Sequence, residues 1–141
     1  MGMENSVLIV DDEVSNILVL SSILKTEYTV YAVKDGEGAV EAANKFNPDV
    51  ILLDIILPGM DGYETITALK TAENTKEIPV IFISGLIDID AEEKGLALGA
   101  ADYIFKPFSP AIIKLRVRNQ MQIVNMRREL KAAAKGGDGS A

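Results

Sequence analysis

The sequence predicts an α/β protein built on a five-stranded parallel sheet with helices on both faces. Five short apolar runs recur along the chain, a segment with helical spacing follows each of them, and turn residues separate the segments. Such alternation produces a doubly wound parallel sheet, because right-handed crossovers place helices on both of its sides. The 141 residues suit a single domain, large enough to bury a core without disulfides or structural metals.

The strands are predicted at the apolar runs. Residues 50–53 (Val-Ile-Leu-Leu) form an uninterrupted apolar run, which is typical of a strand buried on both faces of a sheet. Residues 7–10 and 79–83 have the same character. Two further runs, 29–33 and 102–105, are shorter or mixed and complete the set of five.

The helices are predicted from apolar residues at helical spacing, and they cover residues 14–25, 38–46, 63–72, 91–98 and 110–134. Asp88 or Asp90 can cap the fourth helix, and Ser109-Pro110 can begin the fifth. The fourth helix is short and contains Gly95, so we expect it to be among the less stable elements.

The composition narrows the possible chemistry. The chain contains neither cysteine nor histidine, which excludes thiolate chemistry, catalytic triads with histidine and a phosphohistidine within this chain. A net charge of −7 argues against nucleic-acid binding, and no apolar run approaches the roughly 20 residues that span a bilayer. We therefore expect a cytoplasmic domain that binds neither nucleic acid nor membrane.

Reactive side chains follow four of the predicted strands. Asp11 and Asp12 follow the first strand, Asp54 the third, Ser84 the fourth and Lys106 the fifth. Because the carboxyl ends of parallel strands share one edge of the sheet, these side chains can meet there. Three adjacent carboxylates repel one another unless a cation is present, and oxygen ligands without His or Cys favour Mg²⁺.

The same residues predict phosphoryl chemistry. Asp54 stands alone at its strand end, and a carboxylate can attack phosphorus to give an acyl phosphate. The hydroxyl of Ser84 and the ammonium of Lys106 suit the remaining phosphoryl oxygens, while Asp11 and Asp12 suit the metal. Each residue alone also has a structural explanation, such as helix capping or solvation. Their coincidence at one edge favours a site.

Four motifs together resemble the receiver domain of two-component response regulators. They are Val-Asp-Asp-Glu after the first strand, Leu-Leu-Asp-Ile-Ile-Leu-Pro-Gly-Met-Asp-Gly-Tyr-Glu around Asp54, Ile-Ser-Gly at Ser84 and Tyr-Ile-Phe-Lys-Pro-Phe at Lys106. The resemblance runs from about Ser6 into the first turns of the last helix. It implies a flavodoxin-like fold with strand order 2-1-3-4-5.

The resemblance also implies how the acidic residues act. Asp54 would accept a phosphoryl group from a phosphohistidine of a separate histidine kinase or phosphotransfer protein. Asp12, Asp54 and the backbone carbonyl of Ile56 would ligate Mg²⁺, and Asp11 would contribute through water. The domain would catalyse its own phosphorylation and dephosphorylation, and it would act as a switch rather than as a metabolic enzyme.

The resemblance also implies which residues would carry the conformational change. Ser84 and Lys106 would hold the phosphoryl oxygens, and Tyr103 would be the aromatic residue that turns inward when the Ser84 hydroxyl moves. The helix over 91–98 would then repack. The Lys106–Pro107 peptide bond is expected to be cis. Ile56 and Leu86 occupy the positions that influence access of the hydrolysing water, and their apolar character predicts slow loss of phosphate.

The predicted organisation is a receiver domain over 5–118, a helical extension over 119–134 and a flexible tail over 135–141. A last helix of roughly 24 residues is longer than the fold needs. Its start can cover the sheet through Ile112, Ile113 and Val117. Its extension carries a coiled-coil-like seam of Asn119, Ile123, Met126 and Leu130. The extension is either a dimerising linker to an output domain or an over-long helix with a basic end.

Three other functions remain open. A receiver could signal by binding alone, without phosphorylation, although the complete acidic and basic set argues against it. An FMN-binding flavodoxin-like module needs a Ser, Thr or Gly-rich loop after the first strand, where this chain has Asp-Asp-Glu. An aspartate-based phosphatase would carry Asp-x-Asp-x-Thr, which the sequence lacks.

Overall fold

The structure, a computed structural model, describes residues 5–86 and 88–140, with side chains up to residue 135. Strands and helices alternate along the chain as predicted. The elements are β1 (Ser6–Val10), α1 (Val14–Leu24), β2 (Thr29–Val33), α2 (Gly36–Phe46), β3 (Val50–Leu53), α3 (Gly62–Thr71), β4 (Val80–Ser84), α4 (Ile89–Ala97), β5 (Asp102–Phe105) and α5 (Pro110–Ser140).

The five strands form one parallel sheet in the order β2-β1-β3-β4-β5, which confirms the predicted topology. The register aligns the strand ends. Val10 pairs with Leu53, Leu53 pairs with Phe82, and Ser84 pairs with Phe105. The residues that follow β1, β3 and β5 therefore leave the sheet along the same edge, on either side of Ser84 at the end of β4.

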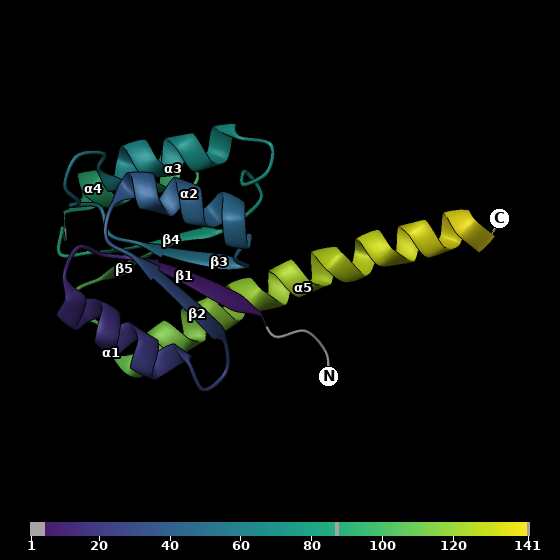
Figure 1. The fold of residues 1–141 in the computed structure, drawn as a ribbon, viewed down its shortest axis with the longest axis horizontal. Helices are drawn as coiled ribbons and strands as arrows, with labels where there is room; N and C mark the ends of the chain where they lie inside the picture. The colour runs from purple at the N-terminus through teal and green to yellow at the C-terminus, as the bar shows by residue number, and fades with distance from the viewer. Residues whose placement is uncertain (1–4, 87, 141) are drawn as a thin grey trace.

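Helices cover both faces of the sheet, and each face has its own apolar core (Figure 1). Leu8 and Val10 of β1 belong to the core beneath α2, α3 and α4, whereas Val7 and Ile9 belong to the core beneath α1 and α5. This alternation is that of a strand buried on both sides, and all four side chains are at most 1% exposed.

Helices α2 and α4 each begin two residues earlier than the sequence predicts, because their capping residues lie just before these earlier starts. The Asp35 carboxylate accepts the N–H of Gly38 at 2.6 Å, so that α2 begins two residues before the predicted start. Asp88, one of the two caps proposed for α4, accepts the N–H of Ala91 at 2.7 Å. That helix therefore starts at Ile89 rather than near Ala91.

The last helix extends further than predicted. It continues to Ser140, through a segment that the sequence predicts to be a flexible tail. No proline after Pro110 interrupts the helix, and the lysines and alanines of residues 131–135 favour it, whereas helix propensity does not explain its continuation through the glycine-rich residues 136–140. Of the helices described, none is both long enough and apolar enough to cross a membrane.

The first half of α5 packs on the sheet, and the second half projects from the body as a rod (Figure 1). The buried side chains are Ile113, Val117, Met121 and Val124, which share one helix face. Ile112, which the sequence places on this face, is 38% exposed instead. The prediction for Ile112 was wrong because one residue of offset turns a side chain by about 100° around a helix.

Candidate functional site

The C-terminal edge of the sheet brings together the side chains that follow three different strands. Asp11 follows β1, Asp54 follows β3 and Lys106 follows β5. The Nζ atom of Lys106 lies 2.9 Å from Oδ2 of Asp54 and 3.3 Å from Oδ2 of Asp11. The backbone N–H of Lys106 donates to the carbonyl of Ser84 at 2.8 Å. The predicted convergence of the Asp11, Asp54 and Lys106 side chains is therefore present in the structure, and Ser84 joins them through its backbone carbonyl.

Three carboxylates at this edge form a group suited to a metal ion. Asp11, Asp12 and Asp54 each offer a carboxylate oxygen, and these oxygens lie within 4.8 Å of one another. Asp11 and Asp54 are 2% and 6% exposed, whereas Asp12 is exposed. A set made only of oxygen donors, with one open side, fits a hard cation such as Mg²⁺, which keeps several waters.

The orientation of Asp11 depends on the start of α1. Its Oδ1 accepts the backbone N–H of Glu13 at 2.9 Å, and its Oδ2 accepts the Asn16 side-chain amide at 3.2 Å. Sequence analysis did not single out Asn16. Its place in the first turn of a helix that follows two aspartates is the signal that could have identified it, because that turn faces the end of β1.

Burial governs the protonation of Asp54. It raises the pKa of this carboxyl group, and the charge of Asp11 adds to the effect, although Lys106 and the Ile56 N–H, 3.3 Å from Oδ1, favour the carboxylate. For Lys106, burial alone would lower the pKa, but the hydrogen bond and charge of Asp54, followed by Asp11, raise it. The two partners thus shift in the same direction, unlike an isolated ion pair. One ammonium contacts two buried carboxylates and only partly offsets the desolvation of Asp54.

The predicted switch residues both contact Leu86, just beyond β4. The fully buried Ser84 Oγ accepts the N–H of Leu86 at 3.1 Å, and the Tyr103 hydroxyl donates to the carbonyl of Leu86 at 2.8 Å. Tyr103, which the resemblance expects to turn inward on switching, is already 5% exposed here, and its ring packs between Phe82 and Phe105, with centroids 6.1 and 5.2 Å away. Leu86 therefore links the Ser84 hydroxyl at the end of β4 to the aromatic side chain on β5.

The rim of the site is apolar. Ile56 is 63% exposed, and Leu86 is partly buried against the core beneath α4. The Ile56 N–H contacts Asp54, whereas a role of its carbonyl as metal ligand stays a prediction. The Lys106–Pro107 peptide bond is cis, as expected.

The family model described as "Response regulator receiver domain" matches residues 7–118, most of this chain. The chain belongs to that family. The match covers the five strands, except for Ser6 at the start of β1, and the first turns of α5. The resemblance found in the sequence motifs is therefore confirmed, and the chain is a receiver domain of the kind found in two-component systems.

Relatives of this receiver domain are longer proteins. "Response regulator PleD" of Caulobacter vibrioides is 35% identical over 136 residues, which cover 96% of this chain and 30% of that protein. A Vibrio cholerae protein named "Probable cyclic di-GMP phosphodiesterase" is 40% identical over 126 residues, 86% of this chain and 29% of that protein. This chain thus spans less than a third of either relative.

A solved structure supports the fold. Chemotaxis response regulator CheY4 of Vibrio cholerae superposes with a TM-score of 0.79 at 28% identity, and the match covers 84% of this chain and 99% of CheY4. The match shows that the receiver fold is complete within this chain, whose α5 continues beyond the residues matched by the family.

Proposed function

We propose that this receiver domain is a phosphorylation-dependent signalling switch. In this proposal Asp54 accepts a phosphoryl group from a phosphohistidine of a separate histidine kinase or phosphotransfer protein in the cytoplasm. The observation that supports it most is the contact of Lys106 with both Asp54 and Asp11 beside a third carboxylate. The donor histidine lies outside these 141 residues, because they contain none.

In the proposed step, a carboxylate oxygen of Asp54 attacks phosphorus in line with the bond to the donor imidazole. The P–O bond forms while the P–N bond breaks, and the imidazole nitrogen leaves with the electron pair. The Lys106 ammonium then transfers part of its interaction from the carboxylate to a phosphoryl oxygen. The Ser84 hydroxyl would donate to another oxygen, so both residues stabilise charge that develops during transfer.

The metal in this proposal is Mg²⁺, held by Asp12, Asp54 and the Ile56 carbonyl, with Asp11 acting through water. When bound, Mg²⁺ would offset the repulsion between the carboxylates and the incoming phosphoryl oxygens. The protein contribution is the fixed orientation of these ligands, for which the contacts of Asp11 with Glu13 and Asn16 provide support.

The conformational change would start at Ser84. When its hydroxyl turns toward the phosphoryl group, it gives up the N–H of Leu86, and the loop that also holds the Tyr103 hydroxyl is released to rearrange. The adjacent α4 is a short helix that contains Gly95, so repacking there costs little. We propose that a kinase-controlled partner or output domain reads this change.

The proposed α5 extension links the receiver to such an output and allows a homodimer. Its seam residues Ile123, Met126 and Leu130 are 42%, 59% and 70% exposed, while Met121 and Val124 face the core. An exposed apolar stripe at coiled-coil spacing is suited to a second copy of the same helix. The boundary at residue 118 falls within one continuous helix, so a linker would transmit rotation of α5 directly.

The test of the switch chemistry is intact-mass analysis after incubation with Mg²⁺ and acetyl phosphate. A single phosphoryl adduct is expected on the wild type, and it should be absent from Asp54→Asn and from protein treated with EDTA. Lack of an adduct on well-folded protein would favour a receiver that signals by binding alone. A yellow colour in the purified protein would instead favour the FMN-binding alternative.

A further inference from the structure

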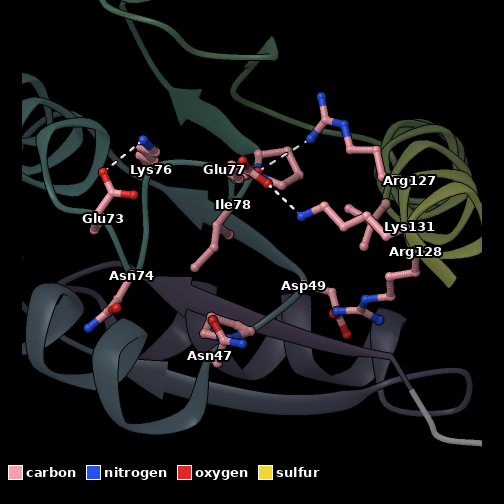
Figure 2. A pocket seen from close by; sticks show the side chains of 13 residues that line it. Asn47, Asp49, Glu73, Asn74, Lys76, Glu77, Ile78, Arg127, Arg128 and Lys131 are labelled. Carbon is pink, nitrogen blue, oxygen red and sulfur yellow. Dashed lines mark hydrogen bonds and ion pairs between the residues drawn. The ribbon is translucent and has the colours of Figure 1, made fainter. Parts of the chain in front are cut away.

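A second polar region lies at the N-terminal edge of the sheet, opposite to the acidic cluster. Two adjoining hollows, of about 360 and 710 Å³, separate α5 from the loop that joins α3 to β4. Both are lined by Lys76 and Glu77 of that loop and by Arg127 and Lys131 of α5. Figure 2 shows Arg127 and Lys131 extending from α5 toward Glu77, with Lys76 on the other side of the hollow.

The side chains around these hollows carry more positive than negative charge. Each carboxylate has one cationic partner, in the pairs Lys76–Glu73, Lys131–Glu77 and Arg128–Asp49. Arg127 instead donates to the backbone carbonyl of Glu77 at 3.4 Å. Lys70 donates to the carbonyls of Lys76 and Ile78 at 3.2 and 2.7 Å. Within the described part of the chain, no carboxylate pairs with Arg127 or Lys70, so two cations remain uncompensated.

The excess of positive charge around the hollows affects the pKa of Lys70. Its side chain is partly buried beneath Gly99, and its pKa is lowered, first by burial and then by the charge of Arg127. Lys70 and Arg127 repel each other even though the whole chain has a net charge of −7. Positive potential is therefore concentrated around these two side chains. An anion placed between α5 and the loop would relieve this repulsion.

We propose that the two hollows form a binding site for a small organic phosphate. The Arg127 guanidinium offers a planar set of donors that fits phosphate oxygens, while Lys131 and Lys76 supply point charges from opposite sides. The volumes fall within the range of small-molecule sites, roughly 300–1,000 Å³. Ile78 and Val124 provide apolar walls for the organic part of the ligand.

Such a ligand would connect two parts of the molecule whose hydrogen bonds with each other, from Arg127 and Lys131 to Glu77, are exposed. It would bridge the α3–β4 loop and α5, at the point where α5 begins to project from the body (Figure 1). Occupancy would therefore stiffen the base of the projecting helix. The proposal requires nothing of Asp54, so its success or failure is independent of the phosphoryl-acceptor proposal.

Calorimetric titration with pyrophosphate tests the site, in a buffer with EDTA so that metal at the acidic edge does not contribute. We expect saturable binding by the wild type, weakened about tenfold or more in Arg127→Gln and further in Arg127→Gln/Lys131→Gln. The matched control is Lys114→Gln/Arg118→Gln, which removes two exposed cations of α5 that do not line the hollows. An equal loss of affinity in this control would show that binding depends only on the net charge of the chain, and it would overturn the proposal.

Glu77→Gln keeps the proposal testable if the double variant unfolds. Removing this carboxylate frees Lys131 and leaves a larger positive excess, so pyrophosphate should bind several-fold more tightly. A purely structural role of the cations predicts instead a lower thermal midpoint without any gain in binding. No saturation by the folded wild type at millimolar pyrophosphate, or no gain in Glu77→Gln, would overturn the proposal.

Discussion

Lys106 reaches from the end of β5 past β4 to Asp54 at the end of β3, where its Nζ atom lies 2.9 Å from Oδ2. The backbone of the same residue is bonded to the Ser84 carbonyl on the intervening strand. Lys106 is thus held at both ends, because its backbone N–H donates to Ser84 and its ammonium group contacts two carboxylates. This relationship joins three strands of the sheet at the site where charge would change on phosphorylation.

Replacing Lys106 with methionine is expected to slow the reaction of Asp54 with acetyl phosphate by roughly 10² to 10³-fold, as when one stabilising donor is removed from a site of developing charge. The variant leaves Asp54 and Asp11 buried without their shared cation. The initial rate of adduct formation at saturating Mg²⁺ gives the measurement. Lys114 is an exposed lysine on α5, so Lys114→Met serves as the control and should react like the wild type.

The apolar rim of the site predicts a long-lived phosphoryl group. Ile56 is 63% exposed next to Asp54 and offers no hydrogen-bonding side chain to orient a water molecule. Ile56→Asn should therefore shorten the half-life of the phosphorylated protein, measured by intact mass after removal of acetyl phosphate. Ile112→Asn changes another exposed isoleucine and should leave the half-life unchanged. A wild-type half-life of seconds would contradict the prediction.

Gly95 allows α4 to lie close to β4. A Cβ atom at this position would lie 2.8 Å from Cδ2 of Phe82, so Gly95→Ala forces the helix away from the sheet. Overpacking of this kind costs about 1–3 kcal/mol, partly offset by up to about 1 kcal/mol of helix propensity. Urea unfolding should show a net loss. Gly85→Ala meets no atom within 4 Å and should change stability little.

The sequence was sufficient to place three side chains of the site at one edge of the sheet, because the strand ends define that edge, while the roles of these residues stay predictions. A residue directly after a buried parallel strand must lie at the carboxyl edge of the sheet, so Asp11, Asp54 and Lys106 could be placed without any knowledge of side-chain contacts. Helix faces were less predictable. Leu18 follows the apolar spacing of α1 and is nevertheless 64% exposed, because spacing alone does not show how wide a stripe the sheet can cover.

The contacts at the opposite edge of the sheet were not predictable from local pattern. Arg128 pairs with Asp49 across 79 positions of the chain, and Asn125 bonds Asn5 across 120 positions. No periodicity or motif identifies partners at that separation. The extension of α5 was therefore interpreted only as a dimerising linker or an over-long helix with a basic end, although the structure anchors its beginning to Asn5 before β1 and to Asp49 before β3.

Truncation of α5 tests how far the folded unit extends. Ending the chain after Arg118 removes Met121 and Val124, which are 3% and 9% exposed, and should lower stability by at least about 3 kcal/mol. Ending it after Lys131 keeps both side chains and the contacts with Glu77, so its stability should equal that of the full chain. Thermal unfolding of both truncations gives the comparison, and equal stability would place the end of the core before residue 121.

Dimerisation through α5 needs a variant that leaves the core intact, because truncation after Arg118 changes stability and oligomeric state together. Ile123→Lys/Met126→Lys changes only exposed positions of the proposed seam. If beryllofluoride and Mg²⁺ produce a dimer of the wild type, measured by light scattering after size exclusion, this variant should remain monomeric, since lysines would face each other across the seam. The control Arg118→Gln/Lys114→Gln changes α5 outside the seam and should still dimerise. A dimer of the seam variant would place the interface on another face of the receiver domain.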